Sequence, residues 1–265
     1  MGVKIGLPLA ALLAVSFAIP TRVGIPSPEN QSVSIIGGDP APEGSAPYMA
    51  AVVIGAQLDS FWCGGSIISR RTILSTAHCL RDQMGVIVGT NHWASGGTKY
   101  SVTKSIRHPG YNHTMRIHDL GLIITALEIK FTEVISPVAL GGDFVGGGVL
   151  ARATGWGLTK FPPILTGSDV LMELNITSIE GEECKKIFKP HNVTVYPDVE
   201  LCLLNSTGHG MCFGDSGSPA VRVDKKEQIG IVSWGTPCAK GYPDVFTRIS
   251  VHKKWITENT VGALD

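Results

Sequence analysis

The stretch "GHGMCFGDSGSPA", residues 208–220, is the part of the chain that most restricts the possible folds, because it surrounds Ser216 with glycines. Gly214 and Gly217 flank Ser216, and Asp215 directly precedes it. Glycine suits positions where the backbone takes a positive φ or where another group approaches closely. The stretch predicts either a tight turn that presents Ser216 as a nucleophile or a surface loop without chemistry, and partners elsewhere decide between the two.

A base and an acid that would activate Ser216 stand earlier in the chain. A serine hydroxyl becomes a good nucleophile when a base takes its proton and a buried acceptor orients that base. His78 in "ILSTAHC" follows an apolar run, and Asp119 in "RIHDLGLIIT" precedes one, where a carboxylate is partly desolvated and needs a partner. Taken alone, His78 is an ordinary surface or core histidine and Asp119 a turn cap. Together with Ser216 they form a candidate catalytic triad.

The N-terminal sequence "MGVKIGLPLAALLAVSFAIP" predicts a secretory signal peptide over residues 1–18. It has an early cation, Lys4, an apolar run from Leu7 and a small-x-small pattern ending at Ala18, and it is too short for a membrane span. We therefore expect a secreted, extracellular chain. The charge is balanced, with 22 basic and 22 acidic residues, and the basic residues form no large cluster. This distribution argues against nucleic acid or an anionic membrane as a partner.

Cysteine usage agrees with an oxidising compartment, because the six cysteines are even in number and allow complete pairing in several ways. They are Cys63, Cys79, Cys184, Cys202, Cys212 and Cys238. The chain has neither Cys-x-x-Cys nor His-Glu-x-x-His, and "GTNHWASGGTKY" lacks the paired acids that calcium prefers. We expect no metal and no cofactor.

Five of the seven asparagines begin the glycosylation signal Asn-x-Ser/Thr, which predicts surface loops in an exported glycoprotein. They are Asn30, Asn112, Asn175, Asn192 and Asn205.

Short apolar or β-branched runs separated by Gly, Pro, Asn and Asp predict an all-β chain, built as one compact unit or as two small barrels. Examples are "MAAVVIG", "LGLIIT", "VLMELNIT" and "QIGIVSW". One helix is predicted at the C-terminus, where Val251, Trp255 and Ile256 follow a helical period after Ser250 as the N-cap.

Eight short motifs occur in the order and approximate spacing of one known family: "IIGG", "CGGSII", "STAHC", "HDLGLI", "ATGWG", "CFGDSG", "IVSWG" and "PDVFTRIS". Over nearly the whole mature chain the sequence resembles the trypsin and chymotrypsin family of secreted serine endopeptidases, with a pattern similar to arthropod chymotrypsin-like enzymes. The Gly-x-Ser-x-Gly motif of α/β-hydrolases is absent, because Ser218 replaces the second glycine.

This resemblance implies a fold of two packed six-stranded antiparallel Greek-key barrels with a C-terminal helix and a catalytic cleft between the barrels. It also implies a propeptide over residues 19–34, a protease domain over 35–258 and a tail over 259–265. The disulfides that it implies are Cys63–Cys79, Cys184–Cys202 and Cys212–Cys238.

The resemblance also assigns roles to the triad. His78 is the general base and then the general acid, Asp119 orients its ring, and Ser216 attacks the peptide carbonyl. The backbone N–H groups of Gly214 and Ser216 form the oxyanion hole.

Three further residues in "SWG" join the site by the same resemblance. Ser233 supports Asp119 through a hydrogen bond, and Trp234 and Gly235 offer an extended edge to the substrate backbone.

Activation is where the sequence departs most from the family pattern. Family members are usually cut before a sequence like "IIGG", and the new α-amine, here that of Ile35, pairs with the acid beside the nucleophile, here Asp215. The preceding residue is Ser34, where Arg or Lys usually stands. We expect cleavage by a protease that accepts small or polar residues, or no activation.

The specificity pocket combines two signals. The floor position of the family falls on Gly210, which carries no charge, and Met211 and Phe213 add apolar walls. Asp244 stands where glycine is usual and faces the same pocket, or else lies solvated in a turn. We expect cleavage after Phe, Tyr, Leu or Met, with tolerance of basic side chains.

Ser218 also replaces a family glycine, and if the backbone there has a positive φ, the serine strains the loop by about 1 kcal/mol. The resemblance implies protein or peptide substrates, with protein protease inhibitors as further partners, and we expect a monomer. The competing hypothesis is a catalytically impaired homologue that serves as a secreted binding or cofactor protein. The intact triad favours the enzyme.

Overall fold

The computed structural model describes residues 1–2, 35–158, 167–236 and 238–263. The described residues from Ile35 onward belong to one compact unit. The predicted signal peptide and propeptide, including Asn30 and Ser34, lie outside the described residues apart from the first two positions. Within the described residues, no helix has both the length and the apolarity to cross a membrane.

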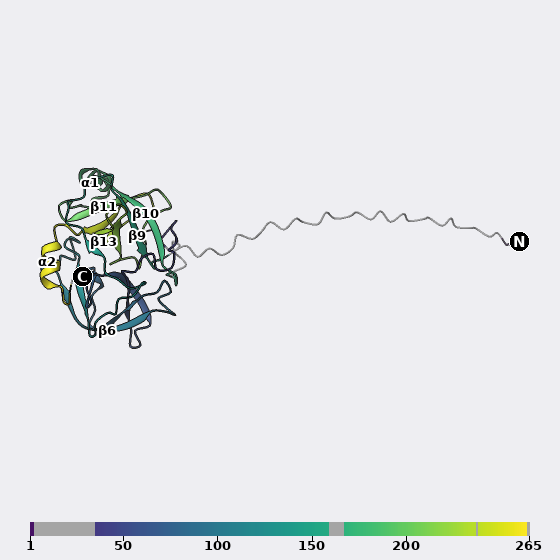
Figure 1. The fold of residues 1–265 in the computed structure, drawn as a ribbon. Helices are drawn as coiled ribbons and strands as arrows, with labels where there is room; N and C mark the ends of the chain where they lie inside the picture. Colours follow the sequence, from purple (N-terminus) through teal and green to yellow (C-terminus); the bar gives the residue numbers. More distant parts are fainter. Residues whose placement is uncertain (3–34, 159–166, 237, 264–265) are drawn as a thin grey trace. The chain divides into compact units, whose positions relative to one another are not determined.

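The first half of the unit is a closed antiparallel barrel (Figure 1, purple to teal). Its strands are β2 (Met49–Ile54), β3 (Ser60–Ile67), β4 (Thr72–Ser75), β5 (Met84–Val88), β6 (Thr98–Arg107) and β7 (Gly121–Thr125). Their order around the barrel is β2-β3-β4-β7-β6-β5. The fourth strand, β5, thus returns beside the first strand, which is a Greek-key arrangement.

The second half repeats this arrangement. Its strands are β9 (Leu150–Gly155), β10 (Met172–Ser178), β11 (Glu200–Leu204), β12 (Pro219–Arg222), β13 (Glu227–Gly235) and β14 (Asp244–Arg248). Their order is β9-β10-β11-β14-β13-β12, closed by pairing of β12 with β9. Two short strands are added outside this ring, β1 (Asp39–Pro40) on β10 and β8 (Ala139–Leu140) on β13. The prediction of two six-stranded antiparallel barrels is confirmed.

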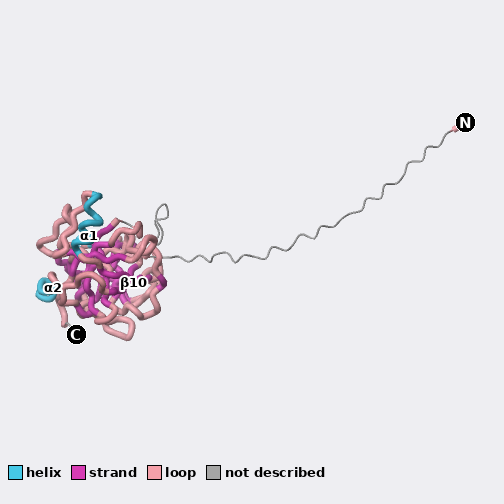
Figure 2. Tube along the Cα trace, turned by 90° about the horizontal axis from the view of Figure 1, so that it is seen from above, coloured by secondary structure: helices cyan, strands magenta, loops and turns pink. Residues whose placement is uncertain are grey.

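Within the described residues helices are few, and the two α-helices lie at the edge of the strands (Figure 2). They are α1 (Gly181–Phe188), α2 (Lys253–Asn259) and the 3₁₀ turns η1 (Ala77–Cys79) and η2 (Lys189–His191). The C-terminal helix is confirmed, but the predicted N-cap is wrong: His252, not Ser250, precedes the first turn, and Val251 is 47% exposed.

Strands near the junction of the barrels are buried on both faces. In β2, Ala50 and Val52 belong to the core of the first barrel, whereas Ala51 and Val53 belong to a cluster shared with second-barrel residues such as Ile231. Side chains alternate along a strand, so one face fills the barrel and the other packs between the barrels. The loops at this junction are therefore held by two cores.

Three disulfides are present, Cys63–Cys79, Cys184–Cys202 and Cys212–Cys238, and these are the pairs that the family resemblance implies. The four described glycosylation candidates, Asn112, Asn175, Asn192 and Asn205, are all exposed.

Candidate active site

The candidate base and its acid are brought together by two paired strands of the first barrel. His78 lies in η1, just after β4, and Asp119 lies just before β7, and these strands pair at Ser75 and Gly121. The His78 ring donates from Nδ1 to Asp119 Oδ2 over 2.7 Å, and the His78 backbone N–H donates to Oδ1 over 3.0 Å. The backbone contact and the ring contact together fix the orientation of the imidazole.

The second barrel completes the surroundings of Asp119, which is only 3% exposed. Ser233 Oγ in β13 donates to Asp119 Oδ2 over 2.7 Å, and Thr247 Oγ1 in β14 donates to the Asp119 carbonyl over 2.8 Å. The carboxyl group therefore accepts three hydrogen bonds, which offset its loss of water.

A cluster of imidazole rings abuts the backbone beside Asp119. His118 Nδ1 and His252 Nε2 lie 2.9 Å apart, and His252 Nδ1 donates to the Arg248 carbonyl over 2.6 Å. The His108 ring stacks on that of His118 with a centroid distance of 5.2 Å. His252 lies 134 residues along the chain from His118, so the sequence gives no sign that the two rings meet.

Ser216 lies in a turn whose glycines have positive φ, 93° at Gly214 and 84° at Gly217. A side chain at Gly217 would run into Gly64 and Ser75 of the first barrel, so the close approach also requires glycine. The Gly64 N–H donates to the Ser216 carbonyl over 2.8 Å, which fixes the turn against the first barrel.

Two features of this turn bear on catalysis. In the described part of the chain, neither the Gly214 nor the Ser216 N–H donates to a backbone carbonyl, so both remain available for an oxyanion. Also within that part, no hydrogen bond joins the His78 ring to the Ser216 hydroxyl, a contact that commonly tightens only when substrate binds.

Asp215, the acid before the nucleophile, is fully buried. It accepts hydrogen bonds from the Gly157 N–H over 2.8 Å and the Cys212 N–H over 2.9 Å. No described cation lies within 4.0 Å of it, and burial raises its pKa to about 7. Ile35, whose α-amine is the predicted partner, is itself completely buried in the core of the second barrel.

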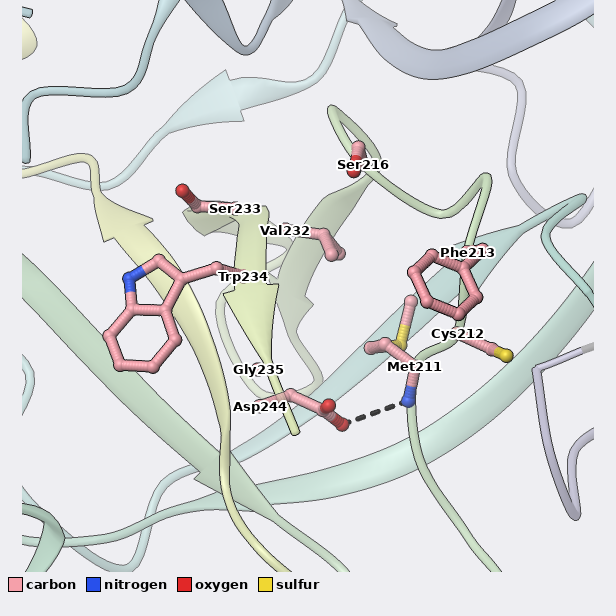
Figure 3. A pocket seen from close by; sticks show the side chains of 9 residues that line it. All are labelled: Met211, Cys212, Phe213, Ser216, Val232, Ser233, Trp234, Gly235 and Asp244. Atoms are coloured by element: carbon pink, nitrogen blue, oxygen red, sulfur yellow. Dashed lines mark hydrogen bonds between the residues drawn. The ribbon is translucent and has the colours of Figure 1, made fainter. Parts of the chain in front are cut away.

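A cavity of about 220 Å³ opens beside Ser216, between β13 and the segment that leads to the nucleophile. Figure 3 shows Ser216 near its mouth and the Asp244 carboxyl at the opposite end, hydrogen-bonded to the Met211 N–H over 2.8 Å. Its lining comprises Met211, Cys212, Phe213, Ser216, Val232, Ser233, Trp234, Gly235 and Asp244. The predicted pocket residues thus meet in one cavity, except Gly210.

Asp244 is 7% exposed, so it is not a solvated turn residue. Burial, with a smaller contribution from the charge of Asp215, raises its pKa to about 8. Gly210 does not line the cavity; a Cβ placed there would lie 2.9 Å from Asp244 Oδ2, so Gly210 leaves room for that carboxyl. The end of the pocket is therefore formed by Asp244, where the sequence had suggested an uncharged glycine.

Beside the pocket, β13 has a free edge. Among the described residues, its pairing with β12 ends at Ile231, and Trp234 and Gly235 pair only with β14. Trp234 Nε1 donates to Glu200 Oε1 over 2.7 Å, and burial raises the Glu200 pKa to about 7. Sequence reasoning missed Glu200, because an acid within an apolar strand carries no sign of the tryptophan that it meets.

Ser218 corrects an expectation. It is not among the residues with positive φ, so the predicted backbone strain is wrong; the left-handed residue is Gly217. Instead, the Ser218 hydroxyl is fully buried and has no hydrogen-bond partner. Ser218 therefore lowers the stability of the fold through the desolvation of its hydroxyl group.

Comparison with known proteins identifies the family. The trypsin family model matches residues 35–256. Chymotrypsin-2 of Vespa crabro is 34% identical over 230 residues, which cover 85% of this chain and 99% of that protein. The clotting factor G beta subunit of Tachypleus tridentatus is 32% identical over 250 residues, which cover 86% of this chain and 80% of that protein.

A solved structure agrees with these relatives. Neuropsin, a serine protease expressed in the limbic system of mouse brain, superposes with a TM-score of 0.77 at 27% identity, over 84% of this chain and 99% of neuropsin. The chain belongs to the trypsin family of serine endopeptidases.

Proposed function

We propose that the protein is a secreted endopeptidase that uses His78, Asp119 and Ser216 to cut peptide bonds after large apolar residues. The observation that carries the proposal is a pair of hydrogen bonds: His78 is bonded to Asp119 in the first barrel, and Gly64 of that barrel is bonded to the carbonyl of the glycine-flanked Ser216. A pure binding module has no need of this arrangement.

The reaction proceeds by acyl transfer. Ser216 Oγ attacks the scissile carbonyl carbon while His78 Nε2 takes the hydroxyl proton, and Asp119 stabilises the resulting imidazolium. The oxygen that becomes negative receives hydrogen bonds from the Gly214 and Ser216 N–H groups. His78 then gives its proton to the leaving amine, and a water molecule, deprotonated by the same ring, hydrolyses the acyl-enzyme.

Specificity follows from the ionisation of Asp244. With a pKa of about 8, this carboxyl is mostly protonated at pH 7 and the pocket end carries no net charge. The apolar walls then favour Phe, Tyr, Leu or Met. Above pH 8 the ionised carboxyl attracts Lys or Arg, so the tolerance of basic residues increases with pH.

Activation requires a cut between Ser34 and Ile35. The α-amine released there pairs with Asp215, supplying the cation that this buried carboxyl lacks. Since Asp215 precedes the nucleophile, the pair shapes the turn that carries the oxyanion donors.

The test is a full-length chain in which residues 30–34 are replaced by Asp-Asp-Asp-Asp-Lys, so that enteropeptidase frees Ile35. The released form is incubated with a peptide library, and cut sites are identified by mass spectrometry beside a Ser216→Ala control. Cleavage after large apolar residues that the control lacks supports the proposal. A folded, released chain without cleavage overturns it and favours the binding homologue.

A further inference from the structure

An arginine that the triad does not use stands at the edge of the cleft. Arg116 lies in the loop before β7, three residues from Asp119, and its guanidinium carbon sits 4.4 Å from the centroid of the Trp234 ring. Its backbone is left-handed, with φ at 58°, and its side chain is exposed. An uncommon backbone conformation thus presents a cation over a residue that lines the catalytic pocket.

The guanidinium retains unused donors. Among the described residues it forms no hydrogen bond, and no carboxylate oxygen lies within 4.0 Å. Stacking on an aromatic ring uses the face of the guanidinium and leaves the N–H groups along its edge, which match a carboxylate. Arg116 can therefore bind an anion without losing an existing hydrogen bond.

Glu200, the acid whose pKa Arg116 lowers, does not neutralise this cation. Glu200 lies beneath Trp234, bonded to its Nε1 and to the Tyr196 N–H, and Arg116 lowers its pKa only in part against the effect of burial. With a pKa of about 7, Glu200 carries roughly half a charge at neutral pH. A net positive charge remains at the cleft edge.

The path of a peptide past Arg116 follows from the free edge of β13. A substrate segment adds to residues 233–235 as an antiparallel strand, with alternate side chains on opposite faces. If one side chain enters the Asp244 pocket, the side chains at the first and third positions before it point to the other face. The loop that carries Asp119 and Arg116 reaches β13 beside this edge, since Arg116 lies on the Trp234 ring and Asp119 accepts a hydrogen bond from Ser233.

We propose that Arg116, held on Trp234, is a specificity-determining residue that selects peptides with Asp or Glu at the first or third position before the residue that fills the pocket. The inference rests on the proposed function, since it requires a substrate strand on β13. The enzyme then combines an apolar requirement in its pocket with an acidic preference upstream of the cut.

The experiment uses the enteropeptidase-released chain and peptide pairs that differ only as Glu against Gln at the first, second or third position before a fixed Phe. Kinetics at pH 7 are expected to show kcat/KM about five- to tenfold higher for Glu at the first or third position. The second position, on the opposite face, is expected to show no preference. Arg116→Gln is expected to bring the ratio to one, and Arg116→Glu to reverse it.

The matched control is Arg70→Gln, because Arg70 also lies over an aromatic ring, that of Phe131 at 4.5 Å, but Phe131, unlike Trp234, does not line the pocket. This variant is expected to keep the Glu preference of the parent. A Glu preference that survives Arg116→Gln, or a parent enzyme with no preference at any position, overturns the inference.

Binding separates this inference from the proposed activity. Labelled peptides are titrated into released Ser216→Ala and into Ser216→Ala with Arg116→Gln, and Kd is obtained from fluorescence anisotropy. A Glu preference that only the first protein shows supports the role of Arg116 even if the parent cuts nothing, which would overturn the proposed function alone. Equal affinities for Glu and Gln peptides overturn the role of Arg116 even if the parent is an active protease.

Discussion

The two barrels share one strand order and place functional residues at equivalent points. In each, the loop between the third and fourth strands carries one of the two proposed reacting groups, His78 after β4 and Ser216 after β11. In each, an aspartate stands where the sixth strand starts, Asp119 before β7 and Asp244 at the beginning of β14. Each barrel thus contributes residues from the same two places, the loop after its third strand and the start of its sixth strand.

What differs is the supply of hydrogen-bond donors to the two aspartates. From the described residues, the carboxyl of Asp119 accepts three hydrogen bonds, from the His78 ring, the His78 backbone and Ser233, whereas that of Asp244 accepts one, from Met211. Both are buried, and burial raises the pKa of Asp244 to about 8. The scaffold sets where an acid lies, and the donors around it determine whether it orients a base or closes a pocket.

The largest expected effect tests whether the two reacting groups act as one unit across the barrels. Ser216→Ala and His78→Ala are each expected to lower kcat by roughly 10⁶-fold, because neither group works without the other. The double variant is expected to be no slower than either single variant. Active-site titration and steady-state kinetics on the released chain measure this, and multiplicative losses would show that the barrels contribute separately.

The next effect separates the two aspartates. Asp119→Asn is expected to lower kcat by about 10²- to 10⁴-fold, since an amide does not stabilise the imidazolium. Asp244→Asn is expected to leave kcat/KM for Phe substrates at pH 7 within about threefold, because the protonated acid it replaces is also uncharged there.

A pH series distinguishes the roles further. The parent is expected to gain activity on Lys substrates, relative to Phe substrates, as pH rises through about 8, and Asp244→Asn is expected to lose that gain. If the parent ratio of Lys to Phe turnover is flat from pH 6 to 9, Asp244 does not titrate in the pocket and the contrast between the two acids fails.

These contrasts also show what the sequence predicts and what it does not. The all-β class and the terminal helix follow from local patterns, because apolar runs and turn residues are written in consecutive positions, whereas the two six-stranded barrels were implied by the resemblance to the trypsin and chymotrypsin family. The roles of Glu200, Arg116 and His252 depend on contacts between segments more than thirty residues apart, as in the Trp234–Glu200 bond. The helix α1 was missed although its acids lie in the first turn and its lysines in the last, an arrangement that favours the helix dipole.

The next prediction concerns Asp215. Its protonation links activation of the chain to the free energy of unfolding. Its pKa is about 7 in the folded chain, above the ordinary aspartate value of 3.8, so the uncleaved protein binds this proton more tightly than the unfolded chain does. The resulting stability is present below pH 4 and is lost as pH rises through 7, by about 4 kcal/mol in all. Once the Ile35 amine is released, its charge replaces the proton until the amine itself deprotonates, near pH 8.

Denaturant unfolding of the uncleaved and released forms from pH 4 to 7.5 measures this difference. Asp244 contributes a similar pH dependence to both forms, so the difference between the two curves isolates Asp215. The released form is expected to be the more stable near pH 7, and with Asp215→Asn the two forms are expected to follow parallel curves. Parallel curves already in the parent would mean that the Ile35 amine does not reach Asp215.

The smallest effect lies where the barrels meet. Ser218 stands just before β12, and a Cβ at Gly64 of the first barrel or Gly155 of the second would crowd its hydroxyl. Because that hydroxyl is buried without a partner, Ser218→Ala is expected to stabilise the fold by about 1 kcal/mol and to leave kcat nearly unchanged. Thermal and denaturant unfolding measure the expected gain in stability.

Replacing the exposed Ser101 of β6 by Ala supplies the control, with an expected change in the free energy of unfolding within about 0.5 kcal/mol. A destabilised Ser218→Ala protein would show that the hydroxyl has a partner and that the contact between the barrels is polar.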